Sequence, residues 1–220
     1  MHLAMYTRPD ITFTVSKLSQ FSSDPSMAHF QAAKHVLRYI QGTLDYGIWY
    51  TSSDSDSIKP LGFSDASFSN DPDDAKSTSG YMFMLANGCI AFRSQKQDTV
   101  ALSSMESEYI ALTEATKEAI FLRRLLASLK FDITNWSLLI KTDSDSALKH
   151  VKNNVKHPRT KHINRRHHYI REIYEIGEID IEHVPAISQA ADILTKPLNA
   201  IKHSCAIELL NLYSFSIPTS

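Results

Sequence analysis

Residues 101–129 read ALSSMESEYIALTEATKEAIFLRRLLASL. Apolar residues recur there at steps of three and four, which is typical of one face of an α-helix; they are Leu112, Ala115, Ala119, Leu122, Leu126 and Leu129. Continued toward the N-terminus, this row reaches Glu108, whereas Glu106 lies about 200° around the helix axis. A carboxylate on a core-facing row is costly unless it has a partner, so the pattern predicts a metal ion or hydrogen-bond donors beside Glu108. The alternative is that Glu108 lies at the rim of the helix and reaches water.

Composition sets the class of protein. The chain has 220 residues, enough for one medium domain with an appendage. It is 43% hydrophobic and 21% charged, with a formal net charge of -1. No apolar run approaches the ~18 residues of a membrane span, and the first residues lack the apolar core of a signal peptide. The two cysteines, Cys89 and Cys205, fit no metal-ligand spacing. We therefore expect a soluble intracellular protein, cytoplasmic or nuclear, without a membrane partner.

The chain divides into three predicted parts. Residues 1–55 have helical spacing with breaks, and we interpret them as a small helical segment. Residues 51–57, TSSDSDS, are polar and low in complexity, so we place a domain boundary there. Residues 58–198 form the main α/β domain, and residues 199–220 form an amphipathic tail.

The main domain is predicted to contain strands and helices in a mixed order. Strands are expected at 58–64, 78–85, 89–93, 136–142 and 179–184, and Asn87-Gly88 is expected to be the turn of a hairpin. The first three strands come before any helix, which favours antiparallel pairing; the last two are separated by helices, which favours parallel pairing. Ser188 is expected to cap a last helix that contains Asp192. The sequence thus predicts a mixed five-stranded α/β sheet flanked by helices.

Four acidic residues occupy matching places on these elements. Asp65 ends the first strand, Glu108 lies on the long helix, Asp143 ends the fourth strand, and Asp192 begins the last helix. If the first and fourth strands are neighbours, Asp65 and Asp143 lie side by side. Carboxylates gathered in one place need cations, and hard oxygen ligands select Mg²⁺ or Mn²⁺. Two such ions are the machinery of phosphodiester hydrolysis, in which one activates a water and the other stabilises the leaving oxygen.

Each carboxylate also has a structural interpretation. Asp65 is a plausible turn residue at a strand end, and Asp143 a plausible cap for the following helix, although Ser144 and Asp145 also suit that role. Asp192 would complement a helix dipole. The metal hypothesis therefore rests on the joint order Asp, Glu, Asp, Asp.

Five segments occur in an order that resembles one family: GFSDASFSNDPDDAKSTSGYMFML, VALSSMESEYIAL, TDSDSAL, RTKHI and QAADILTKPL. Together they are similar to the ribonuclease H domain of copia-type retrotransposon reverse transcriptases. The segments TRPDI and HVLRYIQGTLDYGIWY resemble the region between the polymerase and that domain. The resemblance implies a ribonuclease H-like fold and a C-terminal piece of a Pol polyprotein. It also implies cleavage of the RNA strand of RNA–DNA hybrids, with Asp65, Glu108, Asp143 and Asp192 holding two Mg²⁺ ions.

A basic span offers a place for the nucleic acid. Nine Lys or Arg residues lie between residues 141 and 171, against only two acidic ones. Such side chains position a phosphate backbone without reading its sequence. The candidates for contact with the hybrid are Lys156, Arg159, Lys161, Arg165 and Arg166. The alternative is a solvated helix face.

Two functional alternatives follow from the sequence. An integrase-like nuclease has the same fold, but its helix-borne glutamate comes last in the acidic order, whereas here it comes second. A catalytically inactive, hybrid-binding remnant is the alternative outside enzymes. The chain has no Tyr-x-Asp-Asp polymerase motif, so a polymerase part of a reverse transcriptase is expected only as a partner. We expect residues 56–220 alone to keep hybrid cleavage.

Overall fold

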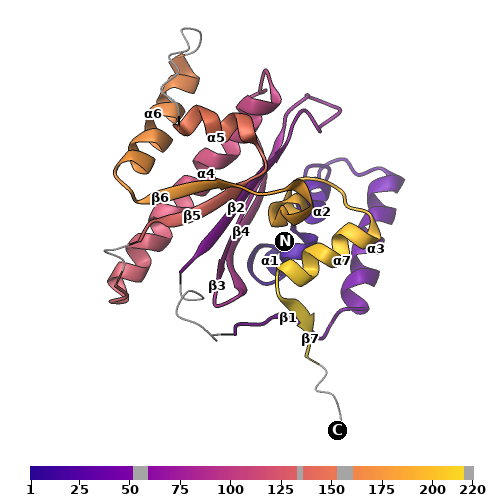
Figure 1. Ribbon diagram of the computed structural model, residues 1–220. Coiled ribbons are helices and arrows are strands. Elements are labelled where there is room, and N and C mark those ends of the chain that lie inside the picture. The colour runs from indigo at the N-terminus through magenta and orange to yellow at the C-terminus, as the bar shows by residue number, and fades with distance from the viewer. Residues whose placement is uncertain (52–58, 133–135, 153–160, 216–220) are drawn as a thin grey trace.

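The computed structural model describes residues 1–51, 59–132, 136–152 and 161–215. Its centre is a five-stranded sheet in the order β4-β3-β2-β5-β6 (Figure 1). The strands are β2 (Leu61–Ser67), β3 (Thr78–Leu85), β4 (Gly88–Lys96), β5 (Leu138–Thr142) and β6 (Ile179–His183). β3 pairs antiparallel with β2 and β4, while β5 pairs parallel with β2 and β6. The predicted mixed five-stranded α/β sheet, with three antiparallel strands followed by parallel strands, is therefore confirmed.

Strand β3 is buried on both faces, and its side chains supply two separate cores. Tyr81 and Phe83 point to the first core, and Met82 and Met84 to the second. Alternation of this kind follows from the two-residue period of a strand. The sheet is thus covered on both sides, as a sheet with parallel strands requires.

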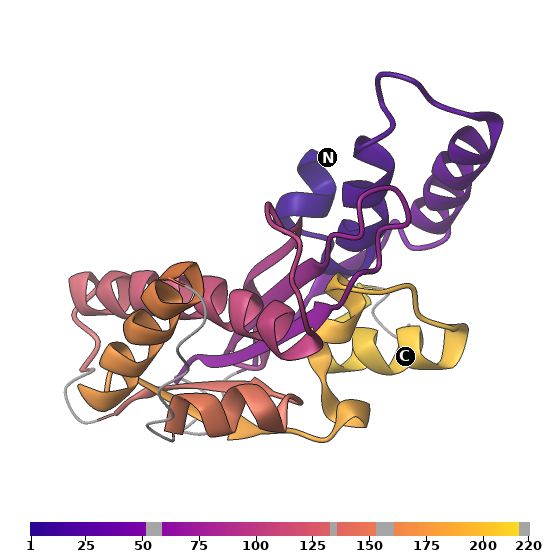
Figure 2. The same ribbon diagram turned by 90° about the horizontal axis from the view of Figure 1, so that it is seen from above.

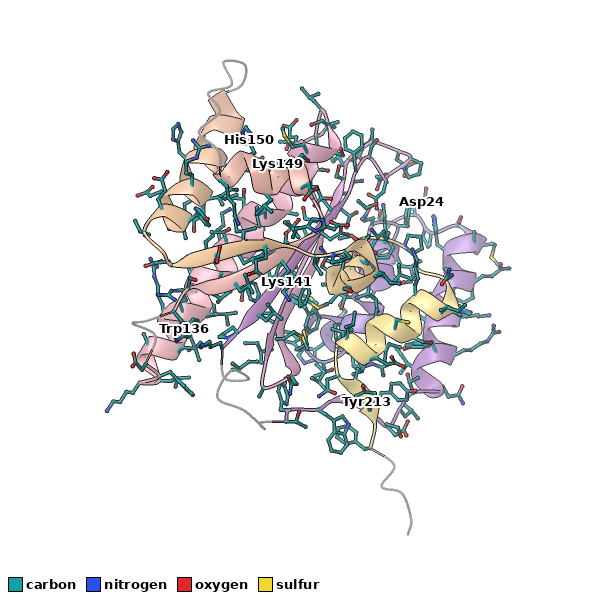
Figure 3. All side chains as sticks on the ribbon, in the orientation of Figure 1. Asp24, Trp136, Lys141, Lys149, His150 and Tyr213 are labelled. Atoms are coloured by element: carbon teal, nitrogen blue, oxygen red, sulfur yellow. The ribbon has the colours of Figure 1, made fainter. Side chains whose placement is uncertain are left out.

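Three helices cover the first face: α4 (Ser104–Ser128), α5 (Asp145–Lys152) and α6 (Lys161–Glu175). The predicted apolar row of α4 is buried from Leu112 to Leu126, whereas Leu129 lies beyond the helix end and is exposed. Ser103 caps α4, because its hydroxyl accepts a hydrogen bond from the Glu106 backbone N–H. Figure 3 labels Lys149 and His150 on α5, and the buried His150 ring packs edge-on against Tyr109 of α4.

The second face is covered by segments from both ends of the chain, which Figure 2 shows together on the side opposite α5 and α6. Direct contact with the sheet is made by α2 (Pro9–Ser19) on β4 and by η3 (Ala190–Leu194) on β2 and β3. Outside these two lie α1 (His2–Tyr6) and α3 (Met27–Gln41), which pack on α2, and α7 (Ala200–Leu209), which packs on η3; η2 (Ala186–Ser188) precedes η3. Buried residues of η3 and α7 fill the second core. Within the part of the chain that the structure describes, no helix is long and apolar enough to cross a membrane.

Contacts cross both of the predicted domain boundaries. Strand β1 (Tyr46–Ile48) pairs antiparallel with β7 (Leu212–Ser214), so the N-terminal segment and the tail share a two-stranded sheet. Lys17 of α2 forms a salt bridge of 2.8 Å with Asp71 of the main domain. The division into 1–55, 58–198 and 199–220 stays a prediction, and any such parts are tied together by these contacts.

Three local predictions are wrong. Strand β2 continues to Ser67, so Asp65 lies within the strand instead of ending it. The hairpin turn consists of Ala86 and Asn87, which both have positive φ and so match the twist of the flanking strands. Finally, η3 is a 3₁₀-helix capped by Gln189, whose side chain accepts the Ala191 N–H, and Ser188 is not its cap.

Candidate metal centre

Asp65 and Asp143 come from neighbouring parallel strands at the middle of the sheet. The β2–β5 register pairs Leu61 with Leu139 and Phe63 with Lys141. Continued by two residues, the same register brings Asp65 level with Asp143, which directly follows β5. Asp65 is only 1% exposed, so the interpretation of this residue as a surface turn residue is wrong.

Glu108 reaches the same place from the first turns of α4. One carboxylate oxygen from each of Asp65, Glu108 and Asp143 lies within 4.8 Å of the others. The Glu108 Oε2 atom is buried and has no hydrogen-bond partner among the residues that the structure describes. The alternative in which Glu108 lies at the helix rim and reaches water is therefore wrong for this atom. A buried carboxylate oxygen without a hydrogen bond is costly, and a cation beside it would remove that cost.

The electrostatics of the three carboxylates are those of a site that needs positive charge. Burial, followed by repulsion from Asp65 and Asp143, raises the pKa of Glu108 to about 9. Burial also raises the pKa of Asp65 to about 6, and the nearby Lys196 opposes that rise. Without a cation the cluster holds a proton near neutral pH, because ionised carboxylates this close repel one another.

Asp192 lies beside this cluster and is joined to Asp65 by a lysine. Lys196 Nζ is 2.8 Å from Asp192 Oδ1 and 3.7 Å from Asp65 Oδ2. The Thr195 hydroxyl donates a further hydrogen bond to Asp65 Oδ2. The structure thus brings Asp65, Glu108 and Asp143 into one cluster and places Asp192 beside it through Lys196.

Sequence reasoning did not find Thr195 or Lys196 as parts of the centre. The available signal was the four-residue spacing from Asp192 to Lys196, which suits an ion pair on one helical turn.

Two glutamines hold the strands and helices that carry the carboxylates, and the sequence did not identify them either. Gln189 Nε2 donates to the Ser64 carbonyl oxygen at 3.0 Å, which fixes η3 against β2 next to Asp65. Gln97 Nε2 donates to the Ser79 hydroxyl and to the Ser107 carbonyl, which links β3 to α4 next to Glu108. Both amides are buried. Positioning of this kind appears only when distant segments meet.

Ser144, and not Asp143, caps the start of α5. The Ser144 hydroxyl accepts a hydrogen bond of 3.2 Å from the Ala147 backbone N–H at the start of α5. Ser144 therefore satisfies that helix end, as Ser at an N-cap does. The Asp143 carboxylate is left in the cluster with Asp65 and Glu108.

The structure describes only some of the predicted basic residues. Lys156 and Arg159 lie outside the described residues. Lys161 and Arg165 belong to α6, but only the backbone is described at these positions. Arg166, also on α6, is half-buried. Contact between these side chains and a nucleic acid stays a prediction.

No protein-family model matches the chain. The chain is 37% identical over 216 residues to the retrovirus-related Pol polyprotein from transposon TNT 1-94 of Nicotiana tabacum, a match that covers 97% of this chain and 16% of that polyprotein. It is also 38% identical over 194 residues to the Pol polyprotein from transposon RE1 of Arabidopsis thaliana, covering 88% of this chain and 13% of the relative. The chain is homologous to one segment of the retrovirus-related Pol polyproteins. The resemblance to copia-type plant transposons is confirmed, and this Pol segment spans about one sixth or less of the relatives' length.

Other similar proteins cover different shares of this Pol segment. It is 52% identical over 122 residues to the secreted RxLR effector protein 161 of Plasmopara viticola, across 56% of this chain and 84% of that protein. Among solved structures, LC11-RNase H1 in complex with RNA/DNA hybrid superimposes with a TM-score of 0.46 and 16% identity, covering 62% of this chain and 94% of that one. The foamy viral protease-reverse transcriptase in complex with RNA/DNA hybrid gives a TM-score of 0.47 and 17% identity, covering 71% of this chain and 22% of that one.

Proposed function

We propose that this Pol segment is a metal-dependent endoribonuclease that hydrolyses the RNA strand of RNA–DNA hybrids. The observation that carries the proposal is the meeting of Asp65, Glu108 and Asp143 oxygens within 4.8 Å, on a mixed sheet, in a chain related to Pol polyproteins. Asp192, next to Asp65 across Lys196, is the fourth acidic residue of the proposed site.

The residues of the cluster fit divalent cations. All the donors are carboxylate oxygens, which favour Mg²⁺ or Mn²⁺ over softer metals. The buried, unpartnered Oε2 of Glu108 is the kind of atom that a cation satisfies. Divalent ions held there would supply the Lewis acidity that phosphodiester hydrolysis needs.

Within this site the protein's own groups have separable roles. Asp65 and Asp143, fixed by neighbouring strands, would hold both of two ions, and Glu108 and Asp192 would complete one ion each. Thr195 orients the Asp65 carboxylate by donating to its Oδ2 atom. Gln97 and Gln189 keep the helices of the site at a fixed distance from the sheet, which is what preorganised catalysis requires.

The substrate is proposed to lie across the site toward α6. Lys156, Arg159, Lys161, Arg165 and Arg166 would contact phosphates of the hybrid without reading its sequence. Discrimination of the RNA strand would come from its 2′-hydroxyl groups and from the shape of the grooves. The polymerase part of a reverse transcriptase is the proposed protein partner.

Cleavage of a labelled RNA–DNA hybrid in Mg²⁺ tests the proposal. The native chain is compared with Asp143→Asn and with the matched control Asp145→Asn, which changes an exposed carboxylate two residues away. We expect cutting of the RNA strand alone, reduced at least about 100-fold by Asp143→Asn, abolished by EDTA and unchanged by Asp145→Asn. A folded native protein that binds the hybrid without cutting it would favour the inactive, hybrid-binding remnant.

A further inference from the structure

Lys196 is placed where a cation is needed. Its ammonium lies between Asp192 and Asp65, whose side chains are 12% and 2% exposed, while the lysine side chain itself is 36% exposed. Among the residues that the structure describes, the ion pairs of Lys196 are the only ones that reach the four acidic residues of the centre. The ammonium therefore compensates one side of the carboxylate cluster.

Compensation is weaker on the other side of the cluster. Among the described residues, the ion pairs of Lys196 reach Asp65 and Asp192, whereas its charge acts on Glu108 and Asp143 only at longer range. Glu108 Oε2 and Asp192 Oδ1 are both buried without a hydrogen bond of good geometry within the described residues. The centre thus has two unlike halves, one with an ammonium in ion-pair contact at Asp65 and Asp192 and one without such a contact at Glu108 and Asp143. A metal ion entering the first half meets a positive charge already in place, and like charges exclude one another at such distances.

We propose that Lys196 is a built-in counter-ion of the metal centre, which competes with a divalent cation for Asp192 and Asp65. The inference rests on the proposed function, because it assumes that the carboxylates bind metal. The ammonium offsets the repulsion between Asp65 and Asp192 before metal arrives, and it has to leave them when metal binds on that side.

The structure provides room for the displaced side chain. Lys196 lines a cavity of about 480 Å³, whose other walls come from α2, α3 and α7 and include His35, Tyr39 and His203. The lysine side chain is 36% exposed, so its ammonium can exchange the carboxylates for water once a divalent cation has taken over their charge.

Metal affinity separates this role from a merely structural ion pair. Mn²⁺ binding is measured by electron paramagnetic resonance on the full chain, without nucleic acid, for the native protein, Lys196→Met, Lys196→Arg and Lys34→Met. Lys34 is the control, since it is an exposed lysine on α3 that lies over the Phe30 ring. We expect Lys196→Met to bind Mn²⁺ about fivefold more tightly than the native protein, and Lys196→Arg and Lys34→Met to stay within about twofold of it.

Thermal unfolding supplies the second readout. In EDTA, Lys196→Met is expected to melt below the native protein, because two buried carboxylates lose their counter-ion; Mn²⁺ is then expected to raise its melting temperature more than that of the native protein. Lys196→Gln replaces Lys196→Met if the latter does not fold.

Two results would overturn the inference in distinguishable ways. Equal Mn²⁺ affinity in the native protein and a folded Lys196→Met would reject the counter-ion role and leave the proposed function standing. Absence of Mn²⁺ binding in every folded variant would reject the metal centre itself, and the counter-ion role with it.

Discussion

Asp71 is expected to be one of the main links between the N-terminal helices and the sheet. Its Oδ2 atom lies 2.8 Å from Lys17 Nζ on α2 and 2.8 Å from Lys96 Nζ on β4. Its Oδ1 atom accepts the Asp73 backbone N–H at 3.0 Å. Hydrogen bonds from Lys17 and then Lys96 hold the pKa of this carboxyl well below its usual range. The substitution Asp71→Asn keeps the shape of the side chain and removes the charge.

The size of the effect follows from burial. Breaking a fully buried ion pair costs about 3–5 kcal/mol, because the remaining charge is left without a partner. Here the side chains of Lys17 and Lys96 are 24% and 25% exposed, so both regain some hydration, and we expect a loss of about 2 kcal/mol. In a domain of this size, 1 kcal/mol shifts the melting temperature by about 2–4 °C, which gives about 4–8 °C.

Urea and thermal unfolding at pH 7 measure the loss, with Asp73→Asn as the control, since Asp73 is exposed and contributes only its backbone to the link. The pH dependence has a definite sign. Because the folded pKa of Asp71 is below the unfolded value, its contribution is complete above about pH 4 and is lost as pH falls further. The gap between the native protein and Asp71→Asn should therefore narrow from pH 5 to pH 3. A gap below about 0.5 kcal/mol at pH 7, or one that widens in acid, would refute the reasoning.

Two other predictions concern the metal centre. A β-carbon at Gly80 would lie 2.7 Å from Thr195 Cγ2, so Gly80→Ala should push η3 away from β3. We expect this variant to lose about 1–3 kcal/mol of stability in urea melts and to bind Mn²⁺ more weakly in paramagnetic titrations. Gly42→Ala is the control and should change neither quantity, since a β-carbon there would lie 3.6 Å from its nearest neighbour. The pKa of Glu108 is about 9 in the folded protein and 4.5 in the unfolded chain. Between these pH values the folded state keeps a proton that the unfolded state has released. The stability of the native protein in EDTA should therefore fall as pH rises from about 4.5 to about 9. Glu108→Gln should flatten that decline in urea melts at pH 5, 7 and 9, and an equally steep decline in the variant would contradict the assignment.

The sequence alone determined the order of most elements and the face of the long helix. Helix α4 could be predicted because its steps of three and four residues are a local property, and β3 and β4 because their apolar runs flank a turn. The motifs around Asp65, Glu108, Asp143 and Asp192 supplied the candidate site, since residue types at fixed places along the chain are visible without coordinates.

Tertiary structure decided what those residues touch. Lys196 sits between Asp192 and Asp65, and Gln97 joins Ser79 to Ser107, because strands and helices far apart in sequence fold against one another. The pairing of β1 with β7 is likewise invisible in either short segment, since each alone is too short to show a strand period. Local patterns record a residue's own backbone preferences and burial, whereas charge compensation and long-range pairing depend on distances that only the folded chain sets.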